Sequence, residues 1–157
     1  MANIIRSFYQ AFADQDAERM VSYYSDEIEF VDPAFGKLKG ERAKNMWRML
    51  LESQKGKKFD VVYSNVKEEQ NRGTAHWEAK YMFSQTGRAV HNKIDAEFVI
   101  SNGKIVQHID RFSTHKWASQ ALGIKGWLLG GTSFFQKKLN AQTSKMLDKW
   151  EESSLKD

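Results

Sequence analysis

Asp32 is the first candidate for a chemical role, because it ends a run of residues that alternate as in a β-strand. The run lies in the stretch EFVDPAFGKLKG at 29–40. Alternate side chains of a strand share one face, so Asp32 points the same way as Ile28 and Phe30. Its carboxyl therefore follows two apolar side chains inward. The alternative is an Asx turn, or a hydrogen bond toward a helix, before Pro33.

A second set of ionisable residues lies on two strands joined by the turn SNGK at 101–104. Asn-Gly favours a two-residue hairpin turn of the primed type, which sets the antiparallel register by counting outward from Ser101 and Lys104. The count predicts three facing pairs on one side of the sheet: Asp95 and Asp110, Glu97 and His108, and Lys93 and Phe112.

Two facing carboxyls repel each other unless one holds a proton or a cation lies between them. A neutral carboxylic acid can donate a hydrogen bond to an oxyanion, and a shared proton lets two carboxyls divide acid and base roles. His108 beside the pair could accept or deliver a proton near neutral pH. The alternative is a side that faces water, where His108 and Lys93 balance surface acids.

The elements that must position these residues are helices first and strands afterwards. Apolar residues recur at helical spacing in three groups: Ile4, Ile5, Phe8 and Phe12; Met20, Val21 and Tyr24 after a cap at Asp16; and Ala43, Met46, Trp47, Leu50 and Leu51 after Gly40. The strand 28–32 lies between the last two groups. From Phe59 to Ser113 the period changes to two, which predicts strands near 58–67, 74–84, 89–101 and 104–113. This order predicts an α+β fold.

The last part of the chain is predicted to add two helices. Thr114 would cap a short helix that ends at Gly123. IKGWLLGGT at 124–132 is predicted to be a hinge-like loop. Ser133 with Gln136 would form a capping box for a final helix, whose apolar residues are Phe135, Leu139, Met146 and Trp150. We therefore predict a domain over 1–123, with 124–157 as a loop and helical extension of the same domain.

Composition restricts the class of protein. The chain has 157 residues, a net charge of +4 and no cysteine, which predicts one domain without disulfides or thiolate metal sites. The four histidines lack metal-ligand spacing, and no basic stripe suggests nucleic-acid binding. No apolar run approaches the roughly 20 residues that span a bilayer, and charges in the first twenty residues break a signal-peptide pattern. We expect no metal, cofactor, nucleic acid or membrane partner, and a cytoplasmic location.

The order of the elements resembles the nuclear transport factor 2-like superfamily, which includes the ketosteroid isomerases and the SnoaL-like polyketide cyclases. The resemblance covers residue 3 to about 123 and runs without gaps through FYQAFADQDAERMVSYYSDEIEFVDP, which ends in Asp-Pro. It implies a cone-like curved antiparallel sheet packed by the N-terminal helices around a pocket. It also implies a homodimer through the convex face of the sheet.

The isomerase pattern assigns roles to individual positions. Its general base falls on Asp32, whose pKa desolvation in a pocket would raise, and its protonated oxyanion-binding acid falls on Asp95. Its oxyanion tyrosine falls on Phe8, which has no hydroxyl. A missing donor of this kind typically costs about 10²–10³ in rate, so Tyr24 or Tyr81 would have to supply a hydroxyl from another wall.

The stretch GKIVQHIDRFSTHKWASQALG at 103–123 is more similar to the SnoaL-like pattern. The matching residues are His108, Asp110, Leu122 and Gly123. In the cyclases, acids and histidines of this kind act on an enolisable substrate. Ser113 stands where that pattern often carries a further acid.

The turn SQTGRA at 84–89 sets which side chains share the side of Asp95. A two-residue Thr86-Gly87 loop would separate a polar face, with the acids in solvent, from an apolar face. A three-residue loop would shift the register by one residue. The pattern favours the first loop, but the resemblance leads us to predict the second. The second loop would place four residues beside Asp95 and Glu97: Trp77, Ala79, Tyr81 and Phe83.

These observations predict a pocket that binds a small, largely apolar carbonyl-bearing molecule and moves a proton, as an isomerase or cyclase does. Asp32 would be the base, Asp95 a neutral donor paired with Asp110, and His108 an orienting group or second acid. The predicted ligand contacts are Phe8, Tyr24, Trp47, Trp77, Tyr81 and Phe112. The alternative is a non-catalytic ligand-binding or assembly module of the same fold, whose final helix docks onto a partner.

Overall fold

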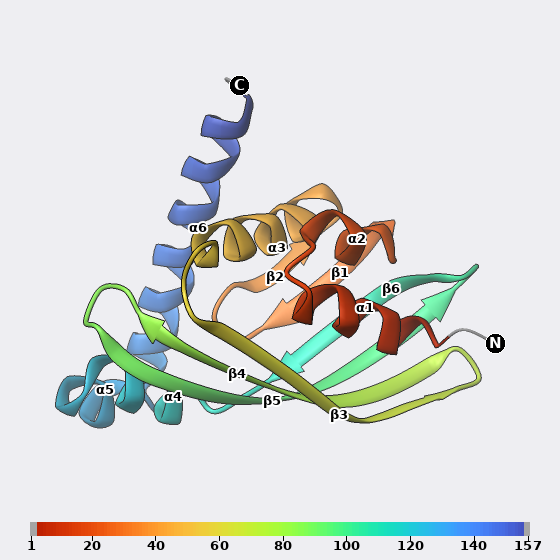
Figure 1. Ribbon diagram of the computed structural model, residues 1–157. Helices are drawn as coiled ribbons and strands as arrows, with labels where there is room; N and C mark the ends of the chain where they lie inside the picture. The colour runs from red at the N-terminus through yellow and green to blue at the C-terminus, as the bar shows by residue number, and fades with distance from the viewer. Residues whose placement is uncertain (1–2, 156–157) are drawn as a thin grey trace.

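Six strands form one curved, open sheet in the computed structural model, which describes residues 3–155 (Figure 1). The strands are β1 (Tyr24–Asp32), β2 (Gly36–Lys39), β3 (Phe59–Glu69), β4 (Arg72–Phe83), β5 (Arg88–Ser101) and β6 (Lys104–Arg111). Their order is β2-β1-β6-β5-β4-β3, and the β1–β6 pair alone in this sheet is parallel. The predicted α+β class with a curved, mainly antiparallel sheet is confirmed.

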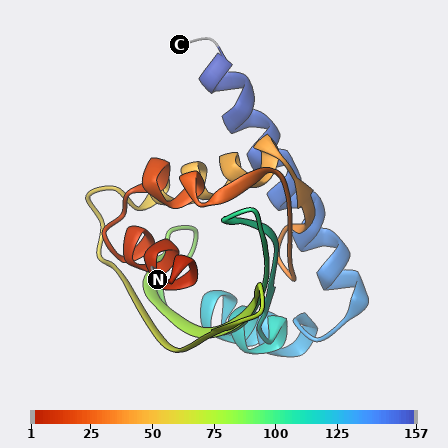
Figure 2. The ribbon, with the colours of Figure 1, turned by 90° about the vertical axis from the view of Figure 1, so that its right-hand side faces the viewer.

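Three helices cover the concave side of the sheet: α1 (Ile4–Ala13), α2 (Ala17–Ser22) and α3 (Glu41–Gln54) (Figures 1 and 2). The side chains of Asn3 and Asp16 cap α1 and α2 by accepting hydrogen bonds from the backbone three residues on. Helix α1 buries Phe8 and Phe12, as its apolar spacing predicts. Tyr24 was expected on the second helix, but it begins β1, because the helix ends at Ser22.

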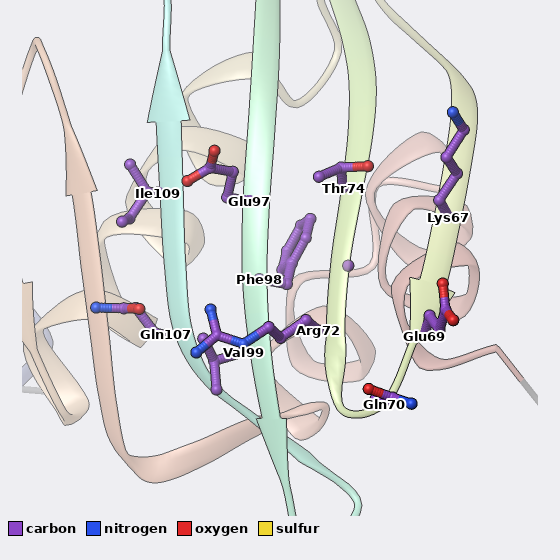
Figure 3. Close-up of a pocket in the computed structure, with 11 residues that line it drawn as sticks. Lys67, Glu69, Gln70, Arg72, Thr74, Glu97, Phe98, Val99, Gln107 and Ile109 are labelled. Carbon is purple, nitrogen blue, oxygen red and sulfur yellow. The ribbon is translucent and has the colours of Figure 1, made fainter.

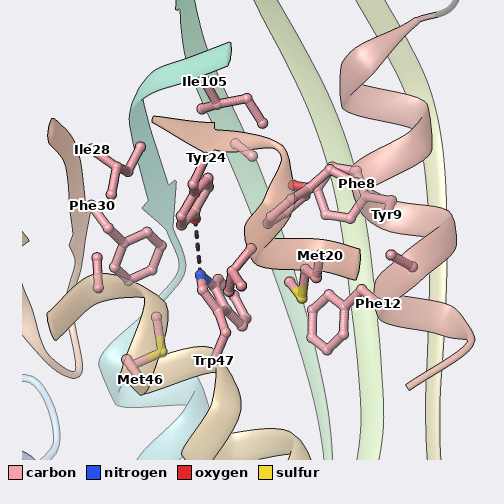
Figure 4. Packing of buried hydrophobic residues seen from close by; sticks show 14 of the residues in the cluster. Phe8, Tyr9, Phe12, Met20, Tyr24, Ile28, Phe30, Met46, Trp47 and Ile105 are labelled. Carbon is pink, nitrogen blue, oxygen red and sulfur yellow. Dashed lines mark hydrogen bonds between the residues drawn. The ribbon is translucent and has the colours of Figure 1, made fainter. Parts of the chain in front are cut away.

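The core beneath these helices is mainly aromatic. Phe8 and Phe12 of α1 pack edge-on against Trp47 of α3, with ring centroids 6.0 and 5.1 Å away (Figure 4). Trp47 in turn lies edge-on to Phe30 of β1. Interlocking rings of this kind favour a rigid interior, which fixes the strands behind them.

The turn between β5 and β6 pairs Ser101 with Lys104 as predicted, but a bulge follows it. Ile100 pairs with Ile105 and Val99 with Gln107, which leaves Val106 as an extra residue. One extra residue turns every later side chain of a strand to the other face. The predicted pairing of facing residues is therefore wrong. The observed neighbours are Asp95 with Arg111, Ala96 with Asp110, Glu97 with Ile109, and Phe98 with His108.

The β4–β5 turn is also different from the prediction. Phe83 pairs with Arg88, so four residues, 84–87, form the loop. Gly87 takes a positive φ of 71° and donates its N–H to the carbonyl of Phe83 at 2.7 Å. An even-numbered loop keeps the same faces together as the two-residue alternative. Trp77 therefore lies opposite Ile94 on the inner face, and the three-residue prediction was wrong.

The chain after β6 forms α4 (Thr114–Leu122), α5 (Ile124–Leu129) and α6 (Ser133–Leu155). The expected loop at 124–132 is thus largely helical. Ser113, rather than Thr114, caps α4 by accepting from Lys116 N at 3.1 Å.

The start of α6 also departs from the predicted capping box. Thr132, rather than Ser133, accepts from Phe135 N at 3.1 Å. Gln136 is turned away from the cap and donates to the carbonyl of Pro33.

Helix α6 packs against α3 and the β1–β2 turn. Asn140 donates to the carbonyls of Pro33 and Ala34 at 2.8 and 2.7 Å. Farther along, Arg42 of α3 pairs with Asp148 at 2.9 Å. These bonds attach the final helix to the turn that directly follows Asp32.

We predict that Asn140→Ala lowers the free energy of unfolding by about 1 kcal/mol, because both carbonyls lose one donor but keep another. Chemical denaturation measures the change. Lys149→Ala is the control, since this exposed side chain lies on the same helix. Equal stability of the two variants would show that the Asn140 bonds do not hold the turn.

Candidate functional site

A cavity of about 370 Å³ lies between the concave face of the sheet and the helices α3, α4 and α6. Its walls are mostly apolar and include Trp47 of α3, Trp77 of β4 and Leu139 of α6. Within the described residues, Asp32 is the single carboxyl that lines it. An apolar cavity with few polar groups is the usual form of a small-molecule site.

Asp32 is held at the edge of this cavity by its own turn. Phe35 N donates to Asp32 Oδ1 at 2.6 Å, so the Asx-type turn and the inward carboxyl occur together. The pKa of Asp32 is raised to about 7, mainly because burial disfavours the carboxylate and further because Asp110 lies nearby. Backbone hydrogen bonds from Phe35 and Ala34 act in the opposite direction. Asp32 can therefore exchange a proton near neutral pH.

Asp110 belongs to a buried chain of hydrogen bonds. Trp47 Nε1 donates to Tyr24 Oη at 2.9 Å, and Tyr24 Oη lies 2.7 Å from His108 Nδ1 (Figure 4 shows the Trp47 bond). His108 Nε2 lies 2.8 Å from Asp110 Oδ1, which also accepts from Trp77 Nε1 at 3.3 Å. All five side chains are buried. The network satisfies polar groups that would be costly to leave unpaired in the core.

The direction of these bonds assigns the protons. Tyr24 accepts from Trp47 and can donate its own hydroxyl hydrogen to His108 Nδ1. The hydrogen of the imidazole then lies on Nε2 and points to Asp110. His108 is held as one tautomer and cannot rotate freely.

The parallel β1–β6 pair brings the two inner acids together. Val31 pairs with Ile109, and the same register places Asp32 next to Asp110. His108 and Asp110 do not themselves line the cavity, whose wall includes Trp47 and Trp77. Asp110 therefore acts on Asp32 through its charge, from behind the cavity wall.

Asp95 lies on the opposite face of the sheet from Asp32. Its side chain is 82% exposed and binds His76 Nδ1 at 2.9 Å. His76 Nε2 binds Glu78, which also binds His91. Hydrogen bonds to Asp95 and Glu78 raise the pKa of His76. The predicted meeting of Asp95 with Asp110 in one pocket is wrong, because the β6 bulge separates them to opposite faces.

The predicted ligand contacts divide into two sets. Trp47, Trp77, Tyr81 and Phe112 line the cavity. Phe8 and Tyr24 are buried in the aromatic core instead. No group of three or more potential metal ligands was found among residues 3–155.

Sequence reasoning missed several residues of the cavity, including Asn92, Trp117 and Gln142. Asn92 pairs with Ala79 on the inner face of the sheet, so the correct register would have shown a polar residue at an inward position. Trp117 lies on α4 and donates its Nε1 hydrogen to Tyr81 Oη at 2.9 Å. The apolar residues of α6 were recognised in the sequence, but they were not expected to line the cavity.

A second hollow, of about 610 Å³, lies on the outer face of the sheet (Figure 3). Its lining includes the charged residues Lys67, Glu69, Arg72 and Glu97. Glu97 pairs with Arg111 at 3.0 Å, and both side chains are more than half exposed. This surface offers neither enclosure nor an isolated acid, so the inner cavity is the better candidate site.

The family of the chain follows from a model of the SnoaL-like domain, which matches residues 5–108. The chain belongs to the SnoaL-like family, and its fold is that of the nuclear transport factor 2-like superfamily, as the resemblance implied. No match was found among curated proteins.

Solved structures of the same fold include three informative cases. TerC, co-crystallised with polyporic acid, is 18% identical with a TM-score of 0.61, over 74% of this chain and 94% of TerC. A putative polyketide cyclase from Xanthomonas campestris is 13% identical with a TM-score of 0.60, over 74% and 93%. A protein from Catenulispora acidiphila with a ketosteroid isomerase-like fold, in complex with trimethylamine, is 10% identical with a TM-score of 0.62, over 77% and 93%. At such identities the likeness shows the fold.

Asp32→Asn should remove the loss of stability that the wild type shows as pH rises. The folded protein holds the Asp32 proton more tightly than the unfolded chain does, so the wild type loses stability as pH rises from about 4 to 7. The asparagine still accepts from Phe35 N and does not ionise. We expect the stability of the variant relative to wild type to rise by about 2–3 kcal/mol between pH 5 and 8.

Denaturant titrations at both pH values measure this difference. Asp60→Asn, which removes an exposed carboxyl, is the matched control and should show no such trend. A constant difference between Asp32→Asn and wild type would contradict the raised pKa.

Tyr24→Phe should be strongly destabilising, because it leaves Trp47 Nε1 and His108 Nδ1 without a partner in the core. We expect a loss of about 2–4 kcal/mol, measured by chemical denaturation. Tyr23→Phe, at the neighbouring half-buried tyrosine, should cost much less. A similar loss in both variants would argue against the network.

Proposed function

We propose that the protein binds a small, largely apolar carbonyl-bearing molecule in the inner cavity and that Asp32 moves a proton on it. The observation that carries the proposal is that one carboxyl of residues 3–155, with a pKa of about 7, lies on the wall of an apolar cavity. A base with a pKa near the working pH combines a useful ionised fraction with sufficient strength.

The proposed reaction begins with the carboxylate form of Asp32. It takes a proton from the carbon next to the ligand carbonyl, and the electron pair of the C–H bond forms an enolate whose charge lies on oxygen. An isomerase returns the proton to another carbon. In a cyclase the enolate carbon attacks a second carbonyl, whose π electron pair moves to its oxygen, and this oxygen takes the proton from Asp32.

The enolate oxygen needs hydrogen-bond donors, which Phe8 cannot provide. Tyr81 lines the cavity and accepts a hydrogen bond from Trp117 Nε1, so its own hydroxyl hydrogen can be donated to a ligand. The amide of Asn92 also lines the cavity. We propose these two groups as the donors that stabilise the oxyanion.

His108 and Asp110 have a positioning role in this proposal. Asp110 contributes to the raised pKa of Asp32, and the fixed His108 tautomer holds Asp110 in place. Neither residue lines the cavity, so neither touches the ligand. Asp95, which lies on the outer face, is not part of the proposed site.

The structural neighbours support a role for this fold with small molecules. TerC was crystallised with polyporic acid, and the Catenulispora acidiphila protein with trimethylamine. The Xanthomonas campestris protein is described as a putative polyketide cyclase. As the family resemblance implies, we also propose a homodimer through the face of the sheet turned away from α1, α2 and α3.

Ligand binding without catalysis is the second candidate, because the described residues give the cavity one carboxyl and not the several that the sequence suggested. The assembly role proposed for the final helix is less well supported, since α6 lines the cavity with Leu139 and Thr143.

Hydrogen–deuterium exchange of 2-tetralone, an enolisable apolar ketone, tests the proposal. Wild type should accelerate exchange of the hydrogens next to the carbonyl, followed by NMR in deuterated buffer. The rate should rise with pH to a plateau, with a midpoint near 7, because only the carboxylate of Asp32 accepts a proton. Asp32→Asn should lower the rate by about 10²–10⁴, the usual contribution of a general base.

Asp95→Asn is the matched control, because it removes an acid of the same kind from the outer face and should leave the exchange rate unchanged. Equal loss in both variants would contradict the assignment of Asp32. Binding of 2-tetralone, detected by tryptophan quenching, without any exchange would assign the cavity to ligand binding alone.

A further inference from the structure

Exposed apolar side chains gather at one end of the molecule. Nine large hydrophobic residues are exposed in the described part of the chain, and five of them lie between 124 and 134. We call these five the α5 patch: Ile124, Trp127, Leu128, Leu129 and Phe134, which are 78, 62, 63, 49 and 66% exposed. Clusters of this kind usually mark a binding surface.

The packing of α5 explains why its large residues face solvent. Helix α5 meets α4 through glycine: a Cβ on Gly126 would lie 1.9 Å from the carbonyl oxygen of Ala118. A Cβ on Gly130 would lie 2.7 Å from the Ala118 side chain. His115 Nε2 further binds the carbonyl of Trp127 at 2.8 Å. The helix therefore buries its smallest residues and exposes its largest, the reverse of an ordinary amphipathic surface helix.

The charge around the α5 patch has one sign. Residues 112–147 contain five lysines and neither aspartate nor glutamate, although the chain has 20 acidic residues. This segment thus carries +5, and the rest of the chain carries −1. Lys138 lies over the ring of Phe134, 5.7 Å from its centroid. Basic and apolar residues are therefore interleaved along this segment, and one lysine lies directly on the α5 patch.

We propose that the α5 patch attaches the protein to the surface of an anionic lipid bilayer. Tryptophan and leucine side chains would enter the interface, and the surrounding lysines would bind the lipid phosphates. Stable attachment to a membrane surface needs two contributions, and here exposed apolar side chains supply one and lysines the other. This inference is independent of the proposed function.

Two observations favour attachment to a bilayer surface. One argues against a second copy of the chain on the α5 patch, and the other against a helix that crosses the bilayer. Pairing two α5 patches face to face would bring lysines against lysines with no acid between 112 and 147 to neutralise them. No helix within residues 3–155 is long and apolar enough to cross a membrane, so the protein would lie on the surface. The contact departs from the sequence expectation of no membrane partner, which rested on the absence of a spanning segment.

Vesicle co-sedimentation tests the proposal with the full chain. Vesicles of mixed phosphatidylcholine and phosphatidylglycerol should bind wild type, and binding should weaken at high salt because the lysine contribution is screened. Vesicles of phosphatidylcholine alone should bind it less. The double variant Trp127→Ser/Leu128→Ser should lose about tenfold or more in affinity for the anionic vesicles.

The control is Val62→Ser/Leu155→Ser, which removes two apolar side chains, 66 and 88% exposed, from outside the α5 patch and away from the inner cavity. It should bind as wild type does. Circular dichroism and 2-tetralone exchange without vesicles should be the same in all three proteins, which separates loss of attachment from loss of fold or site.

Three results would overturn the proposal. These are no binding of wild type to anionic vesicles, equal binding by the α5-patch variant and the control, or equal binding to neutral and anionic vesicles. Sedimentation velocity tests whether a second copy of the chain binds this surface instead. If wild type does not bind vesicles and forms a dimer that only the α5-patch variant loses, the α5 patch is a self-association surface.

Discussion

The parallel pairing of β1 with β6 is the constraint on which the candidate site depends. It places Asp32 beside Asp110 in the interior, where two carboxylates cannot both be charged at low cost. Asp110 is supported by His108 and Trp77, whereas Asp32 keeps only backbone donors. Burial, with a smaller contribution from the charge of Asp110, raises the pKa of Asp32 to about 7.

The final helix completes the environment that this assignment requires. Helix α6 contributes Leu139 and Met146 to the cavity wall, and Asn140 fastens the turn after Asp32. An acid on an open sheet face would be hydrated and would behave as an ordinary surface carboxyl, as the exposure of Asp95 illustrates. Helix α6 thus closes one side of the cavity that Asp32 lines, and burial raises the pKa of this acid.

The molecule keeps its apolar groups in two places that serve different purposes. Inside, aromatic rings from α1, α3 and the sheet pack around a hydrogen-bonded chain. At the end formed by α5, glycine contacts with Ala118 leave Trp127 and Leu128 in solvent. A surface arranged in this way is stable only if its close packing offsets the exposed area, or if something covers it.

The sequence alone determined which way several side chains face within a single strand or helix. Alternation in β1 was sufficient to turn Asp32 inward with Phe30, and helical spacing was sufficient to bury Phe12 and Trp47, because these patterns depend on geometry within one strand or helix. Only the tertiary structure decided that Asp110 faces inward and Asp95 outward. That outcome depends on a single unpaired residue, Val106, and on a four-residue turn at 84–87, and one-residue changes of register cost little locally but reverse every side chain beyond them. The cavity wall from α6 was likewise beyond the sequence, because its position is set by contacts with α3 and Pro33 more than a hundred residues earlier in the chain.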